Sequence, residues 1–151
     1  MKHREWQMKP FRNFLLLLVT SAAVLAIATP AHSDDVIYFD GDSYAAIAYS
    51  PKTAKFGIGY NYGTRAAAEK EAMKQCEADD AKIVVWVHNG FCALALGDDK
   101  SVWGVGWSYG DGARTREAKS FALEECNKRT KNAEIHAVAC SSDAMKPFIK
   151  K

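Results

Sequence analysis

The sequence predicts an α+β domain made of two tandem copies of one strand–strand–helix–strand unit, with about six strands in an antiparallel or mixed sheet and two helices. Three observations predict this class: an internal repeat at an offset of about 47 residues, glycines that alternate with aromatic residues, and alanine-rich segments with helical spacing. The copies span 44–91 and 92–140. We expect an approximate two-fold axis to relate them.

The repeat consists of four matches that occur in the same order in both copies. The matched pairs are 46–48 with 93–95, 56–63 with 103–110, 68–76 with 118–126, and 83–87 with 135–139. The second pair is the clearest, because Phe-Gly-Ile-Gly-Tyr-Asn-Tyr-Gly aligns with Trp-Gly-Val-Gly-Trp-Ser-Tyr-Gly. Chance can produce one such match, but four in one order indicate a tandem duplication.

The first copy opens with two strands joined by a turn. Residues 44–49 favour a strand, and Ser-Pro-Lys-Thr at 50–53 supplies residues that are common in turns. Over 56–62, aromatic and aliphatic residues alternate with glycine and asparagine, which is the side-chain period of a β-strand. We therefore expect a second strand there.

A helix and a third strand complete the copy. Thr64 is a suitable N-cap for a helix over 65–77, in which small residues recur at i, i+4 and i+8 from Ala68. The run 83–87 is apolar at every position, which is typical of a strand covered on both faces. Small helical residues and strand glycines favour close packing, but the pattern leaves open whether the glycines or the aromatic residues face the helices.

The first 33 residues have the three parts of a secretory signal peptide. A basic opening precedes an apolar run at 14–28, and Ala-His-Ser at 31–33 places small residues where a signal peptidase reads them. We expect cleavage between Ser33 and Asp34. The apolar run is shorter than the roughly 20 residues that a bilayer-spanning helix needs, so we expect no stable membrane anchor after cleavage. An uncleaved anchor is the alternative.

Removal of the signal peptide changes the charge of the chain. Four of the 20 basic residues and one of the 18 acidic residues lie within it, which leaves 16 and 17 and a net charge of −1. This charge argues against nucleic-acid binding, which depends on basic residues. We expect a secreted or periplasmic protein with a flexible segment at 34–43, one domain at 44–140 and a tail at 141–151.

All four cysteines lie in the expected mature chain, and an even number in a small exported domain predicts two disulfides. Seven extended residues span roughly 23 Å, whereas a disulfide tolerates Cα separations up to about 7 Å. A disulfide between two cysteines at opposite ends of the same strand is therefore disfavoured. We expect Cys76 to pair with Cys126, and Cys92 with Cys140. Zinc binding is the competing interpretation, but no C-x-x-C spacing is present, and we expect no metal or cofactor.

Short motifs in both copies carry a resemblance to a known family. They are Ala-Ile-Ala-Tyr-Ser-Pro at 46–51, Thr-Arg-Ala at 64–66, Asn-Gly-Phe-Cys-Ala-Leu-Ala at 89–95, and the closing Cys140. In these motifs the chain resembles a bacterial family of exported proteins, domain of unknown function 4189, over nearly all of 44–140.

Members of that family often carry further cysteines at the start of each copy's last strand, near the places of Ala81 and Glu134 in this chain. The resemblance therefore implies that Cys76 and Cys126 pair with each other or stay free. It implies no catalytic residues, because the family has none that are accepted.

Histidines and acidic pairs are the candidates for chemistry. His88 stands at the end of an expected strand, whereas His136 lies within an apolar strand, where a structural role is typical. No serine motif of the nucleophile-elbow type is present, so the sequence assembles no catalytic set. The acidic residues at 40–42, 98–99 and 111 favour turns over calcium binding, because they lie beside glycines and lack EF-hand spacing.

Aromatic residues on the strands form the candidate binding face. They are Tyr60, Tyr62, Trp103, Trp107 and Tyr109. An exposed aromatic face stacks on sugar rings or docks another protein, whereas a face covered by helices is ordinary core. We favour a non-enzymatic binding module for an unknown protein or glycan ligand. The alternative is a small secreted hydrolase or effector that uses His88.

Overall fold

A computed structural model describes residues 36–37, 39–110 and 112–150. The first half of the domain contains β2 (Tyr44–Tyr49), β3 (Phe56–Tyr62), α1 (Arg65–Cys76) and β4 (Lys82–His88). The second half contains β5 (Gly90–Leu96), β6 (Trp103–Tyr109), α2 (Thr115–Asn127) and β8 (Glu134–Cys140). Three short strands are added to these: β1 (Val36–Ile37), β7 (Ala113–Arg114) and β9 (Phe148–Ile149).

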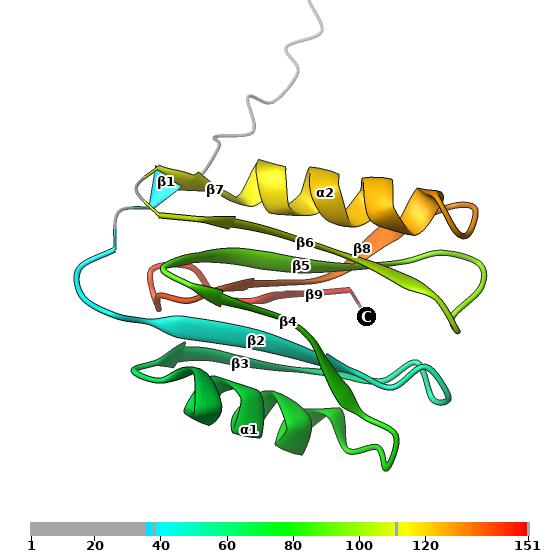
Figure 1. Cartoon of the computed structure of the whole chain (residues 1–151), viewed down its shortest axis with the longest axis horizontal. Helices are drawn as coiled ribbons and strands as arrows, with labels where there is room; N and C mark the ends of the chain where they lie inside the picture. Colours follow the sequence, from blue (N-terminus) through cyan, green and yellow to red (C-terminus); the bar gives the residue numbers. More distant parts are fainter. Residues whose placement is uncertain (1–35, 38, 111, 151) are drawn as a thin grey trace, which may run out of the picture. The chain divides into compact units, whose positions relative to one another are not determined.

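The longer strands form two antiparallel sheets that pack face to face between the helices. The first sheet has the order β3-β2-β4 and the second β6-β5-β8-β9, while β1 pairs with β7. From top to bottom in Figure 1, the layers are α2, the second sheet, the first sheet and α1. The α+β class with two helices is confirmed, but the strands form two packed sheets instead of the one expected.

The central strands β2 and β5 are buried on both faces. Ile47 and Tyr49 of β2 and Leu94 of β5 pack between the two sheets. The alternate residues of the same strands are mostly alanines, and they lie beneath α1 or α2. Because alanine is small, each helix approaches its sheet closely along this central strand.

The glycines of β3 and β6 face the helices, which answers the question that the sequence left open. A Cβ atom on Gly59 would lie 2.0 Å from the backbone oxygen of Ala68, and one on Gly106 would lie 2.1 Å from that of Ala118. No side chain fits in so small a gap. The aromatic residues that flank these glycines, such as Tyr60 and Trp103, therefore point away from the helices and towards the core between the sheets.

The predicted N-cap of the first helix is confirmed. The Thr64 hydroxyl accepts a hydrogen bond of 3.3 Å from the backbone N–H of Ala67, and the helix begins at Arg65. It ends at Cys76, where Glu77 adopts a left-handed conformation with φ of 49°.

The two halves share one irregularity in their pairing. The ladder between β2 and β4 skips Val84, and the ladder between β5 and β8 skips His136. A β-bulge therefore interrupts the last strand of each half at the same distance from its start. Val85 and Ala137, which directly follow the bulges, thus occupy equivalent places in the two sheets.

The cysteines do not form the predicted disulfides. Cys76, Cys92, Cys126 and Cys140 are all free and buried. Cys76 belongs to α1 and Cys126 to α2, and each side chain packs between its helix and the sheet that this helix covers, so both sheets lie between them. Cys92 points between the sheets, whereas Cys140 points towards α2 from the neighbouring strand. The pairing of Cys76 with Cys126 needs both helices on one sheet, and the packing of two separate sheets contradicts it. The pairing of Cys92 with Cys140 fails because the two side chains point to opposite faces of one sheet.

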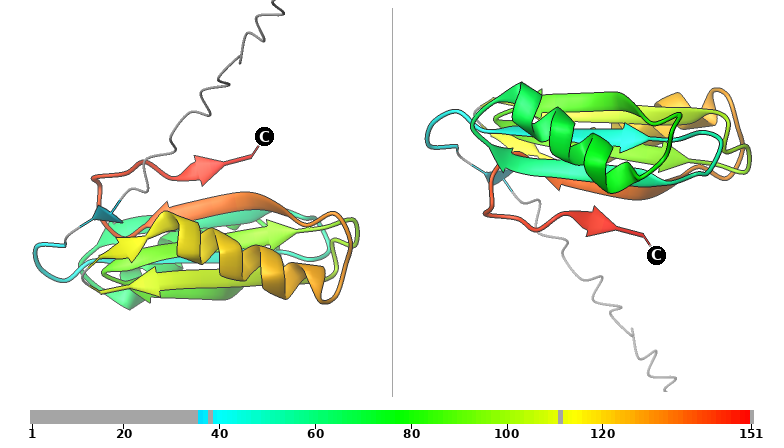
Figure 2. Two further views of the ribbon diagram at one scale, coloured as in Figure 1. Left: turned by 90° about the horizontal axis from the view of Figure 1, so that it is seen from above. Right: turned by 90° about the horizontal axis from the view of Figure 1, so that it is seen from below.

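Segments outside the repeats also pack on the domain. The segment 34–43, expected to be flexible, contributes β1, and the ring of Phe39 lies 6.5 Å from that of Phe91. The expected C-terminal tail contributes β9, which runs beside β8 (Figure 2). The predicted signal peptide and its cleavage site lie outside the described residues. Neither helix in the described part of the chain is long and apolar enough to cross a membrane.

Candidate ligand-binding groove

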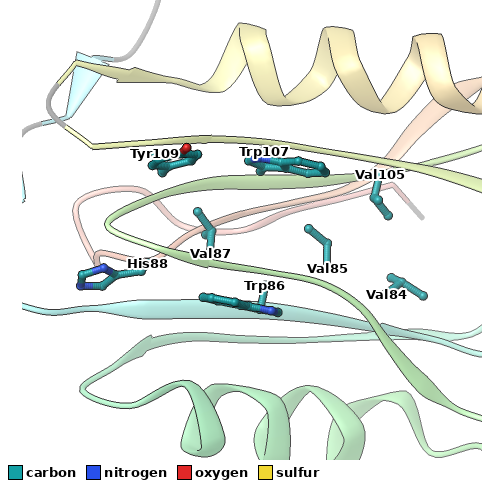
Figure 3. A pocket seen from close by; sticks show the side chains of 8 residues that line it. All are labelled: Val84, Val85, Trp86, Val87, His88, Val105, Trp107 and Tyr109. Carbon is teal, nitrogen blue, oxygen red and sulfur yellow. The ribbon is translucent and has the colours of Figure 1, made fainter.

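A groove of about 440 Å³ runs between β4, at an edge of the first sheet, and β6, at an edge of the second (Figure 3). Five consecutive residues of β4, 84–88, line one wall. Val105, Trp107 and Tyr109 of β6 line the other. The lining is therefore mostly valine and aromatic side chains, with one histidine.

The β4 wall is the edge of a strand. Successive side chains of a strand point to opposite faces, so five consecutive residues line one groove only where it follows the strand's edge. Val85 and Val87 are buried between the sheets, whereas Trp86, on the other face, is 41% exposed. Among the described residues, β4 pairs with β2 alone. The predicted coverage of this strand on both faces is therefore wrong, because its apolar run also lines the groove.

The β6 wall results from the alternation of glycine and aromatic residues. Because Gly104 and Gly106 face α2, the residues between and after them face the first sheet. β4 is the last strand of that sheet, and the side chains of Trp107 and Tyr109 lie above it in Figure 3. They are 51% and 70% exposed, so this part of β6 has an uncovered aromatic face.

The structure divides the predicted aromatic face between several places. Trp107 and Tyr109 line the groove. Trp103 is half-buried, and its ring meets that of a core tyrosine edge-on at 5.6 Å. Tyr60 and Tyr62 lie on β3, at the opposite edge of the first sheet, and Tyr60 packs against the core between the sheets. The structure thus brings together two of the five predicted residues.

Trp86 is the groove aromatic that the predicted face omitted. The guanidinium carbon of Arg65, at the start of α1, lies 4.1 Å from the centroid of its ring, a cation–π contact. The sequence contains a signal for this residue, because Trp86 is the one aromatic in the aliphatic run 83–87, and the matching run has Val138 in its place.

His88 lies at the C-terminal end of the β4 wall. Its Nε2 is 2.8 Å from Oδ1 of Asp42, and its ring stacks on Tyr44 with centroids 4.6 Å apart. Both side chains of the His88–Asp42 pair are exposed. Among the described residues, no serine or cysteine side chain hydrogen-bonds to this pair.

The other candidate residues lie outside the groove. Partial burial, with the charges of Lys100 and Lys150, lowers the pKa of the His136 imidazole. Asp99 accepts hydrogen bonds from the backbone and hydroxyl of Ser101, as expected of a turn. In the described part of the chain, no group of three or more His, Cys, Asp or Glu residues could hold a metal ion.

The fold and the groove define a small α+β domain with an apolar, ligand-sized cleft between the edges of two packed sheets. Residues 44–140, from β2 to β8, match the family described as domain of unknown function (DUF4189), and the protein belongs to this family. The family that the sequence motifs indicated is therefore confirmed. No curated protein and no solved structure matches the chain.

Proposed function

We propose that this protein is a non-enzymatic binding module that holds a protein or glycan ligand in the groove between β4 and β6. The observation that carries the proposal is the exposure of three aromatic side chains, Trp86, Trp107 and Tyr109, around one apolar groove. A ligand that stacks on aromatic rings of this kind and displaces water from them binds with a more favourable free energy. The groove has the size of a site for a few residues of a peptide or a few sugar rings.

We propose further that the module acts outside the cytoplasm, in the cell envelope or the extracellular space. The support is the N-terminal pattern of basic residues, apolar run and small residues before Asp34. The cysteines add no support, because they form no disulfide. The proposed compartment therefore depends on the N-terminal pattern alone.

The domain is also proposed to be a tandem duplication. The register of β4 on β2 matches that of β8 on β5, with the bulge at the same place, and the register of β3 on β2 from Ala46 to Tyr49 matches that of β6 on β5 from Ala93 to Leu96. The glycines at matching places of β3 and β6 contact the backbone of α1 and α2 in the same way. Two unrelated segments would have no reason to share all of these details.

The test is capture of the ligand followed by measurement of its affinity. The protein, produced from its full-length sequence, is used to capture ligands from cultures of the organism that makes it, and each purified ligand is titrated against variants. Trp107→Ala should weaken binding at least about tenfold, as loss of an interface aromatic commonly does. Phe121→Ala, which removes a 53% exposed ring from α2, is the matched control and should bind normally. Equal affinity of both variants would exclude the groove.

A second candidate function is a small hydrolase or effector, and the contact between His88 and Asp42 at the groove favours it. An aspartate can orient a histidine that acts as a general base. His88→Ala should then abolish turnover of a captured ligand, whereas in a binding module no turnover occurs with either form.

A further inference from the structure

The C-terminal strand β9 shows how this fold accepts an added strand. β9 pairs antiparallel with β8, with Phe148 opposite Val138 and Ile149 opposite Ala137. The backbone N–H of Lys150 continues the ladder with a hydrogen bond of 2.9 Å to the carbonyl of His136. A short segment with an aromatic and an aliphatic residue thus extends the second sheet.

β4 occupies the same place in the first sheet as β8 in the second. Each pairs with the central strand of its sheet and carries the bulge at the same register, so Val85 is equivalent to Ala137 and Trp86 to Val138. Among the described residues, however, β8 has a neighbour on both sides, whereas β4 has one neighbour. The edge that β9 covers in the second sheet is the edge that lines the groove in the first.

We propose that the groove takes an extended peptide segment of a partner protein, which adds to β4 as an antiparallel strand in the register that β9 has on β8. The inference rests on the proposed function and names the class of its ligand. An edge strand presents unpaired N–H and C=O groups, and these groups give an added strand its affinity. In this register, one side chain of the added segment would lie beside Trp86. The next side chain would lie beside Val85, on the face of the first sheet that Trp107 faces.

One charge distinguishes the two edges and defines the chemistry of the partner segment. β8 begins with Glu134, whose carboxylate forms an ion pair with the ammonium of Lys150, the residue directly after β9. The equivalent first residue of β4 is Lys82, whose ammonium lies 4.3 Å from the ring centroid of Trp103 at the start of β6. A complementary segment therefore has an aromatic residue, an aliphatic residue and an acidic residue in succession.

The probes are two synthetic peptides that differ in one charge. One has the sequence of residues 144–150, which ends in Phe-Ile-Lys, and the other has glutamate in place of the last lysine. Titration of the full-length protein, followed by tryptophan fluorescence, should show that the glutamate peptide binds about fivefold more tightly, since opposite charges across strands attract and like charges repel. Lys82→Glu should reverse this preference.

Two controls separate strand addition from simple apolar contact. A glutamate peptide with an N-methyl group on the nitrogen of its final glutamate keeps every side chain but loses the backbone donor that corresponds to the N–H of Lys150 in β9, and it should not bind. Phe121→Ala should bind both peptides as the unaltered protein does. Binding of the methylated peptide, or an unchanged preference in Lys82→Glu, would overturn the inference.

Failure of the inference is distinguishable from failure of the proposed function. If neither peptide binds but a captured glycan loses affinity in Trp107→Ala, strand addition is excluded and the groove remains a binding site. If a captured ligand is indifferent to Trp107→Ala and neither peptide binds, the groove itself is excluded.

Discussion

Asn89 and Ser141 make the same pair of hydrogen bonds at the ends of the two halves. The Asn89 side-chain oxygen accepts from the backbone N–H of Ser43 at 2.9 Å, and the Ser141 hydroxyl oxygen accepts from that of Gly90 at 2.9 Å. The backbone N–H groups of Asn89 and Ser141 donate in return to the carbonyls of Ser43 and Gly90, each at 2.9 Å. Each residue thus ties the end of a half to its beginning.

Asn89→Ala should lower the free energy of unfolding by about 2 kcal/mol, because it removes an acceptor and places alanine in the left-handed region, where Asn89 has φ of 47°. Asn89→Asp keeps the acceptor and should cost less than half as much. Ser141→Ala leaves the N–H of Gly90 without its partner and should cost about 1–2 kcal/mol. Urea unfolding measures all three. A loss in Asn89→Ala no larger than that in Asn89→Asp would contradict this role.

The second prediction concerns the close approach of α2 to β6. A Cβ atom on Gly104 would lie 2.1 Å from the backbone oxygen of Ala122 and 2.4 Å from the backbone nitrogen of Cys126. Gly104→Ala therefore pushes the helix from the sheet and should cost about 1–3 kcal/mol in thermal or urea unfolding. Gly63→Ala is the matched control, since a Cβ there meets nothing within 4 Å, and its effect should stay within about 0.5 kcal/mol. Equal losses would show that the contact is unimportant.

The local elements of this fold are predictable from the sequence because their signals are local. The turn-forming residues at 50–53, the N-cap Thr64 and the alternation over 56–62 each act within a few residues, and the elements lie where they predict. The assignment of the glycine face to the helices is not local. It depends on how closely the backbone of a helix approaches the strand, and the alternation of glycine with larger residues does not specify that distance.

The candidate site is less predictable, because it depends on which strands lie at the edges of the sheets. The same alternation places Trp103 and Trp107 on one face of β6, yet Trp103 packs on the core and Trp107 lies in the groove. The difference arises from the position of β4, a strand of the other sheet. The pairing of Cys76 with Cys126 failed for a related reason, since these cysteines match in sequence but lie on opposite outer faces of the two packed sheets.

The third prediction follows from the burial of the cysteines. Burial raises the pKa of the thiols of Cys76, Cys92, Cys126 and Cys140, so little of the reactive thiolate forms at neutral pH. A thiol reagent should label none of the four in the native protein and all four in urea. Mass spectrometry should find no mass gain on reduction, and a gain would show that a disulfide forms although the side chains pack on different faces of the sheets.

The last prediction concerns stability in acid, and it starts from a carboxylate that holds a turn. The buried hydroxyl of Ser50 donates a hydrogen bond of 2.6 Å to Oδ1 of Asp80, and the backbone N–H of Lys52 donates one of 3.1 Å to Oδ2. The hydrogen bond from Ser50 is the main cause that lowers the pKa of Asp80 in the folded protein. The ionised carboxylate is therefore more favourable in the folded chain than in the unfolded chain.

Because the pKa of Asp80 is lowered in the folded protein, its carboxylate stabilises the fold at pH values above the ordinary pKa of aspartate, about 3.9. This stabilisation is lost as the pH falls through the pKa that Asp80 has in the folded protein. Asp80→Asn should accordingly lower the unfolding midpoint in urea at pH 7, and its difference from the unaltered protein should shrink as the pH falls below 4. Asp79→Asn, on the exposed neighbouring residue, should change the midpoint little at either pH. If the Asp80→Asn difference is the same at pH 7 and at pH 3, the carboxylate charge does not hold this turn, and the contacts of Ser50 alone account for it.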